Sequence, residues 1–115
     1  METIYRVQNR YGKGPYSYKE RLENDRALFT MFRKHENDKY HSGPIRDCGR
    51  APVRGVEACA FESMDSLRLW FTEDDLKVLH RHRFRIYRIV ADVTARGHAQ
   101  VLFNVSTIVS TVKMA

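Results

Sequence analysis

The centre of the chain, residues 57–81, joins a short apolar segment to two capped amphipathic patterns, and strand-like segments lie on both sides of it. Residues 3–9 and 84–93 are rich in β-branched and aromatic side chains, which favours strands. After a turn at Gly97, the stretch "AQVLFNV" can pair with 84–93 as a hairpin. Because strands enclose helices in this order, we expect an α+β fold with a twisted, mostly antiparallel sheet and two or three short helices.

Polar residues mark where the central helices begin. Ser63 follows the apolar segment, and its hydroxyl can cap the next helix. Thr72, with Asp75 three residues later, has the spacing of a capping box. Residues 20–33 carry an apolar stripe with helical spacing, and residues 106–114 are apolar enough for a last strand. The periodicity predicts one buried cluster made up of Phe61, Leu67, Trp70, Phe84, Ile86, Leu102 and Phe103.

The composition bounds the size and class of the protein. A chain of 115 residues suits a single domain, 1–115, with a modest hydrophobic core. Hydrophobic residues make up 43% and charged residues 30%, which excludes disordered and fibrous classes. The sequence shows no leader-like segment and no apolar run near ~20 residues. The two cysteines, Cys48 and Cys59, do not form a CxxC pair. We therefore expect no membrane contact and a cytoplasmic protein of the host cell with reduced thiols.

The net charge of +6 favours an anionic partner. Positive charge is densest in "HRHRFRIYR", residues 80–88, which we interpret as a basic strand. The expected partner is the acidic surface of a host or defence protein complex, with nucleic acid as another possibility. The alternative is an ordinary solvated strand face. Residues 35–56 show no periodicity, and loops of this length are commonly functional, so this loop is expected to share the contact. The candidate partner-binding residues are Arg81, Arg83, Arg85 and Arg88.

Several chemistries lack their sequence patterns. There is no GxxxxGK[ST] and no GxGxxG after a strand, which excludes nucleotide binding by those routes. His80 and His82 form an HxH pair, but nothing is spaced to complete a tetrahedral set, so no metal is expected. Cys48 has only His41 as a local base, which leaves a Cys–His catalyst as a weak alternative. Tyrosines interleaved with basic residues keep nucleic-acid binding open without a known module. These patterns predict no cofactor.

Three polar residues occupy notable positions in the predicted strands. Arg6 lies in the middle of "IYRV", where a charge is costly unless it reaches a sheet edge or pairs with an anion. Ser63 follows "CAF", and Gln100 opens "QVLF". Each has an ordinary explanation, as an edge arginine, a helix cap and a strand glutamine. Together they are also candidate catalytic residues, and Arg6 and Ser63 are candidate cofactor-binding residues.

The order of segments along the whole chain resembles a family of small phage and prophage proteins. The matching pieces are "YRVQNRYGKGPY", "HSGPIRDCG", "CAFESMDSLRLWF", "FRIYRI" and "AQVLF". They cover most of the chain, and the resemblance implies an origin in a phage or another mobile element. It carries no activity that can be transferred to this chain.

The order of Arg6, Ser63 and Gln100 is similar to that in mono-ADP-ribosyltransferases of the arginine–serine–glutamate kind. The resemblance implies that Arg6 grips NAD and that Ser63 steadies the nicotinamide pocket. Gln100 stands where those enzymes have a glutamate, and a neutral glutamine cannot supply the same charge stabilisation. What the resemblance implies for this chain is therefore an ADP-ribosyltransferase-like, split antiparallel sheet, with NAD as a cofactor only if the chain is an active transferase.

These observations lead to one expected function and two alternatives. The expected function is that of a phage accessory protein that binds and inhibits or redirects a host or defence macromolecule, as anti-CRISPR proteins do. This expectation follows from the implied origin and not from a residue pattern. The first alternative is an active NAD-dependent mono-ADP-ribosyltransferase, and the second is a nucleic-acid-binding protein.

Overall fold

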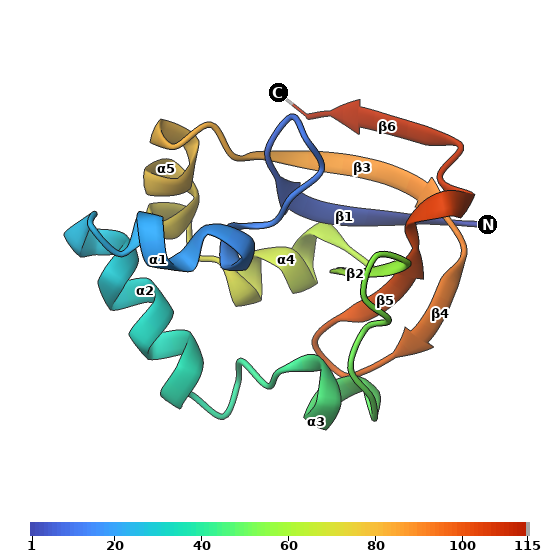
Figure 1. Ribbon diagram of the computed structural model, residues 1–115, viewed down its shortest axis with the longest axis horizontal. Coiled ribbons are helices and arrows are strands. Elements are labelled where there is room, and N and C mark those ends of the chain that lie inside the picture. The colour runs from blue at the N-terminus through green and yellow to red at the C-terminus, as the bar shows by residue number, and fades with distance from the viewer. Residues whose placement is uncertain (115) are drawn as a thin grey trace.

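The computed structural model describes residues 1–114 and confirms the α+β class. The strands in this part are β1 (Glu2–Gln8), β2 (Glu57–Ala60), β3 (Arg85–Ala91), β4 (Val93–Arg96), β5 (Val101–Asn104) and β6 (Ser110–Lys113). The helices are α1 (Lys19–Leu22), α2 (Arg26–Asn37), α3 (Pro44–Cys48), α4 (Met64–Trp70) and α5 (Glu73–Arg81), with 3₁₀ turns η1 (Pro15–Tyr18) and η2 (Val105–Thr107). Figure 1 shows α1, α2 and α5 on one side of the molecule and the strands on the other.

Two antiparallel sheets are present, whereas the strand pattern predicted one twisted sheet and the resemblance to ADP-ribosyltransferases implied a split sheet. One has the strand order β1-β3-β6, and the other has the order β2-β5-β4. The chain leaves the first sheet at Asp92, whose backbone N–H donates to Thr107 Oγ1 at 2.9 Å. The predicted strand 84–93 is therefore divided into β3 and β4. Backbone hydrogen bonds of 2.8 Å in both directions between Tyr5 and Phe61 join the two sheets.

The predicted hairpin around Gly97 is present, but only with the second half of the divided strand. The backbone N–H of Gly97 donates to the carbonyl oxygen of Gln100 at 2.8 Å, and β4 pairs with β5. On its other side β5 pairs with β2. The expected last strand is also confirmed, because β6 pairs with β3.

The described part of the chain has five α-helices, more than the two or three expected. The predicted helix 20–33 is divided into two helices. α1 ends at Leu22, and Asp25 is the N-cap of α2, where its side chain accepts a hydrogen bond from the backbone N–H of Ala27. Within the predicted loop 35–56, α2 continues to Asn37 and the short helix α3 forms after Gly43. The predicted caps of α4 and α5 are confirmed. Among these helices none is long and apolar enough to span a bilayer.

The core contains two clusters instead of the single cluster expected. Six of the seven predicted core residues are buried and Ile86 is partly buried, so the inward faces were assigned correctly. Trp70 and Phe84 belong to a cluster between the helices and the first sheet, whereas Phe103 belongs to a smaller cluster between the two sheets. The core is divided into two clusters because the strands form two separate sheets.

Asp47 fixes α3 against the turn between β4 and β5. Its carboxylate accepts hydrogen bonds from the backbone N–H groups of His98 (2.8 Å), Ala99 (3.1 Å) and Gln100 (2.9 Å). Gly97 has no room for a side chain, since an added Cβ would lie 2.2 Å from Asp47 Oδ2. The segment expected to be a long loop is thus anchored to the second sheet next to Gln100.

The basic stretch 80–88 is not one strand. Arg81 is the last residue of α5, and Arg83 adopts a left-handed conformation with φ of 70° in the connection to β3. Only Arg85 and Arg88 lie in β3, and their spacing of three places them on opposite faces of the sheet. The predicted single basic strand face is therefore wrong, because a helix end and a turn occupy half of the stretch.

Candidate functional site

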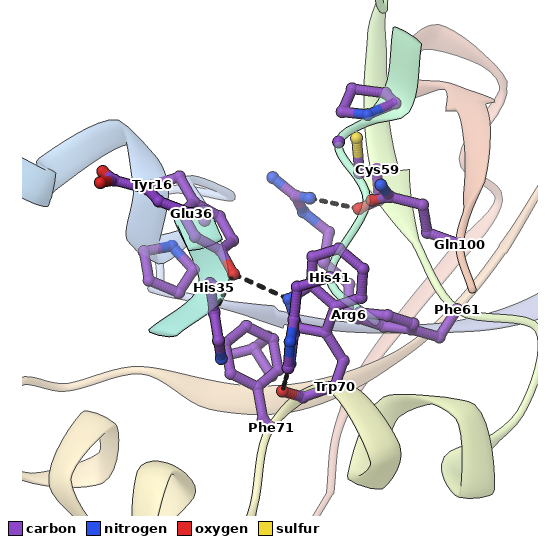
Figure 2. Close-up of a pocket in the computed structure, with 15 residues that line it drawn as sticks. Arg6, Tyr16, His35, Glu36, His41, Cys59, Phe61, Trp70, Phe71 and Gln100 are labelled. Atoms are coloured by element: carbon purple, nitrogen blue, oxygen red, sulfur yellow. Dashed lines mark hydrogen bonds between the residues drawn. The ribbon is translucent and has the colours of Figure 1, made fainter. Parts of the chain in front are cut away.

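A cavity of about 450 Å³ lies where β1, η1, the end of α2, the connection 38–43, β2 and the end of α4 meet. We call it the Arg6 cavity. Figure 2 shows the side chains of Arg6 and Gln100 on either side of Cys59, with the rings of His41, Trp70 and Phe71 below them. The cavity is of a size common for small-molecule sites. Its walls are mainly the rings of Tyr16, His35, His41, Phe61, Trp70 and Phe71.

Arg6 is the cation of this cavity. Its Nε donates to Gln8 Oε1 at 3.1 Å, and its Nη1 donates to the carbonyl oxygen of Cys59. Among the described residues no carboxylate lies within ion-pair distance of Arg6, and the cavity residue Glu36 is paired with Lys19. Burial lowers the pKa of Arg6, because the surrounding protein leaves its charge less well hydrated.

Gln100 lies at the start of β5 and is only 5% exposed. Its Nε2 donates to the carbonyl oxygen of Ser42 at 2.9 Å. Its backbone N–H donates to Asp47, and its backbone oxygen accepts from Gly97 and from the thiol of Cys48. These contacts fix Gln100 in the wall of the cavity.

A hydrogen-bonded set of rings forms the opposite wall. Trp70 Nε1 donates to the Tyr16 hydroxyl at 2.7 Å, and that hydroxyl pairs with His35 Nδ1 at 2.6 Å. His41 Nε2 donates to the Trp70 carbonyl oxygen at 2.8 Å. The His35 and His41 rings stack with centroids 4.0 Å apart. The connection 38–43 is thus held by the His41 ring on one side and by Gln100 on the other.

Three titratable groups of the cavity, His35, Tyr16 and Cys59, are held in their neutral forms at neutral pH. Burial, followed by the charge on His41, lowers the pKa of His35 to about 4. Burial raises the pKa of Tyr16, and it raises the pKa of Cys59 to about 11. Cys59 is therefore a thiol and a weak nucleophile. The arrangement is suited to binding an anion beside apolar rings, and it offers no activated nucleophile among these three groups.

Over residues 1–115 the chain matches the family described as Bacteriophage T4 Y00F protein. The chain belongs to this family. The predicted phage origin is therefore confirmed, whereas the resemblance to ADP-ribosyltransferases is not shown by the comparisons. No curated protein and no solved structure gives a significant match.

In this phage family member, Arg6 and Gln100 come together and Ser63 does not join them. Arg6 and Gln100 both line the cavity. Ser63 is the N-cap of α4: its Oγ accepts a hydrogen bond from the backbone N–H of Ser66 at 3.0 Å. Ser63 is not among the residues that line the Arg6 cavity.

The four candidate partner-binding arginines differ in what they contact. Arg81, Arg83 and Arg88 are exposed. Arg85 is partly buried and donates to the carbonyl oxygens of His80 and Phe84, at 2.9 Å each. In this family member Arg81 Nη2 also lies 3.7 Å from the Asp25 carboxylate, whereas Arg83 and Arg88 make no ion pair with the described residues.

The ring wall of the cavity was missed by the sequence analysis. Tyr16, His35, His41 and Trp70 come from four separate segments, and no spacing in the sequence connects them. Trp70 was expected in the core, and His41 was considered as a base for Cys48 and, like His35, as a metal ligand without a partner. The one available signal was Arg6, a charge in the middle of a strand.

Proposed function

We propose that this phage protein acts by binding, and that the Arg6 cavity receives a small ligand with one anionic group on a flat, apolar body. The observation that carries the proposal is a partly buried guanidinium without a carboxylate partner among the described residues. A poorly hydrated charge is costly unless an opposite charge or several hydrogen bonds compensate it.

Arg6 retains donors for such an anion. One N–H is used on Nε and one on Nη1, so N–H groups on Nη1 and Nη2 remain. Together these two nitrogens can grip a carboxylate or a phosphate with two parallel hydrogen bonds. Gly14 leaves space beside Nη2, because the Cβ of any other residue at this position would lie 3.2 Å from that nitrogen.

The ring wall supplies the apolar part of the proposed site. Phe61, Trp70 and Phe71 are buried and belong to the larger core cluster, so the wall is already formed without a ligand. A preformed wall lowers the entropy cost of binding. Ring side chains also favour a flat ligand, which can stack or pack edge-on against them.

The earlier expectations about partners remain predictions. Inhibition of a host or defence macromolecule would use the exposed arginines Arg81, Arg83 and Arg88 in addition to the cavity. The alternative of an NAD-dependent transferase is less well supported by the cavity residues. Ser63 lies outside the cavity, and Gln100 lacks the negative charge that the resemblance requires.

A thermal-shift titration tests the proposal with three probes: phenyl phosphate, 3-phenylpropionate and the neutral analogue 3-phenylpropanamide. At least one of the two anions should raise the melting temperature, and the amide should not. The Arg6→Gln variant should lose the response. Arg54→Gln removes an exposed arginine away from the cavity and should keep it. Equal responses to the amide and the anions, or an unchanged response in Arg6→Gln, would contradict the proposal.

A further inference from the structure

Gln100 has one polar atom whose role the fold does not explain. Its backbone groups and its Nε2 are all hydrogen-bonded within the protein. Its side-chain oxygen, Oε1, accepts no hydrogen bond from the described residues, although the residue is only 5% exposed and lines the Arg6 cavity. Gln100 Oε1 is not among the described side-chain atoms that are shielded from solvent without a partner, so it is open to the cavity and can accept a hydrogen bond from a bound molecule.

The orientation of the amide is fixed by its neighbour. The partner of Nε2 is the carbonyl oxygen of Ser42, which can only accept a hydrogen bond. Turning the amide over would place two oxygens against each other, so Oε1 cannot exchange places with Nε2. Asp47 further restrains Gln100 by binding its backbone N–H at 2.9 Å.

We propose that Gln100 determines the specificity of the Arg6 cavity by accepting a hydrogen bond from an N–H group of the ligand. The inference rests on the proposed function, and it adds a second requirement to it. The ligand would carry an anionic group for Arg6, a flat apolar body for the rings, and an N–H donor for Gln100. A bound ligand without the donor would cut this oxygen off from water without pairing it, and sites of this kind reject such analogues.

Two kinds of small molecule carry this combination of groups. In a nucleoside monophosphate, the base supplies both the flat body and the N–H, and the phosphate supplies the charge. In an N-acylated aromatic amino acid, the amide supplies the N–H and the carboxylate supplies the charge. Both kinds of molecule offer the same three groups to the cavity. The experiment therefore contains one matched pair of probes for the nucleotide and one for the acylated amino acid.

The first pair is uridine 5′-monophosphate and its N3-methyl derivative, which lacks the ring N–H. The second pair is N-acetylphenylalanine and 3-phenylpropionate, which lacks the amide. Calorimetric titration of the wild-type protein should show that the donor-bearing member of at least one pair binds about tenfold more tightly, or better. The pair that shows the preference identifies the source of the ligand.

The Gln100→Met variant keeps the length of the side chain and removes the acceptor. It should bind both members of the responding pair with similar affinity, and a thermal melt establishes that it is folded. If it does not fold, the comparison of the pairs on the wild-type protein still tests the proposal. Equal affinity within both pairs would overturn the role of Gln100 while leaving the anion site intact. If none of the four probes nor phenyl phosphate binds, the proposed function fails and this inference fails with it.

Discussion

Lowering the pH from neutral should destabilise the fold through His35. His35 is only 6% exposed, and its Nε2 has no hydrogen-bond partner among the described residues. The nearest carboxylate oxygen, on Asp75, is 3.9 Å away, and His41 stacks on the ring. Burial and the charge on His41 lower the pKa of His35 from 6.5 to about 4. Between these two pKa values, His35 is protonated in the unfolded chain and neutral in the folded protein.

The direction and size of the loss of stability follow from the shift in the pKa of His35. Because the folded-state pKa is depressed, the stabilising contribution of neutral His35 is complete above about pH 6.5 and is lost progressively down to about pH 4. Asp75 and Asp38 favour the proton, and Lys34 opposes it, but burial outweighs them. Between about pH 7 and about pH 5 the expected loss is about 2 kcal/mol of unfolding free energy. This is a large share of the ~5–15 kcal/mol typical of a domain.

Urea denaturation of the wild type and of His35→Gln at these two pH values measures the effect. A glutamine can still accept the Tyr16 proton but does not titrate, so the stability of the variant should depend much less on pH. His98→Gln, which removes an exposed histidine, is the matched control and should behave as the wild type does. If the wild type and His35→Gln lost the same stability, the assigned burial and protonation of His35 would be refuted.

Three further predictions concern the fold and its charged surface. Trp70→Ala should cost about 3–5 kcal/mol because it empties a large buried volume, and native-like melting would contradict the assigned core. Gly97→Ala should cost about 1–3 kcal/mol through its clash with Asp47, whereas Gly43→Ala, with open space around its Cβ, should be nearly neutral in chemical denaturation. Replacing the exposed arginines with glutamine should leave the melting temperature unchanged. The variant should bind polyglutamate more weakly and with a smaller dependence on salt concentration. Unchanged binding would exclude the exposed arginines as the contact surface for an acidic partner. The arginines in that variant are Arg81, Arg83 and Arg88.

Local signals in the sequence were sufficient for the helix starts and most of the core. Ser63 and the pair Thr72 and Asp75 cap helices as expected, since capping depends on residues only three positions apart. The division into two sheets was not predictable in this way. It depends on the backbone of Asp92 meeting Thr107, 15 residues along the chain, and no short pattern encodes that contact.

Two residues of the candidate site, Arg6 and Gln100, were predicted from the sequence, and only Arg6 carried a physical signal of its own. Arg6 was identified because a charge in the middle of a strand requires compensation. His35 and His41 gave no such signal, because each lies in a polar segment and becomes buried only when α2 and the connection 38–43 pack against Trp70. The helix α3 was missed because its five residues are too few to show a helical period.

Calorimetric titration of phenyl phosphate, and separately of 3-phenylpropionate, into the wild-type protein, Arg6→Gln and Arg54→Gln tests the central claim most directly. We predict saturable binding of at least one of the two anions with the wild type and Arg54→Gln, and a loss of at least about tenfold in affinity with Arg6→Gln, since two charge-assisted hydrogen bonds disappear. The absence of binding of both anions to the folded wild type, or equal affinity in all three proteins, would contradict the assignment of the Arg6 cavity as an anion site.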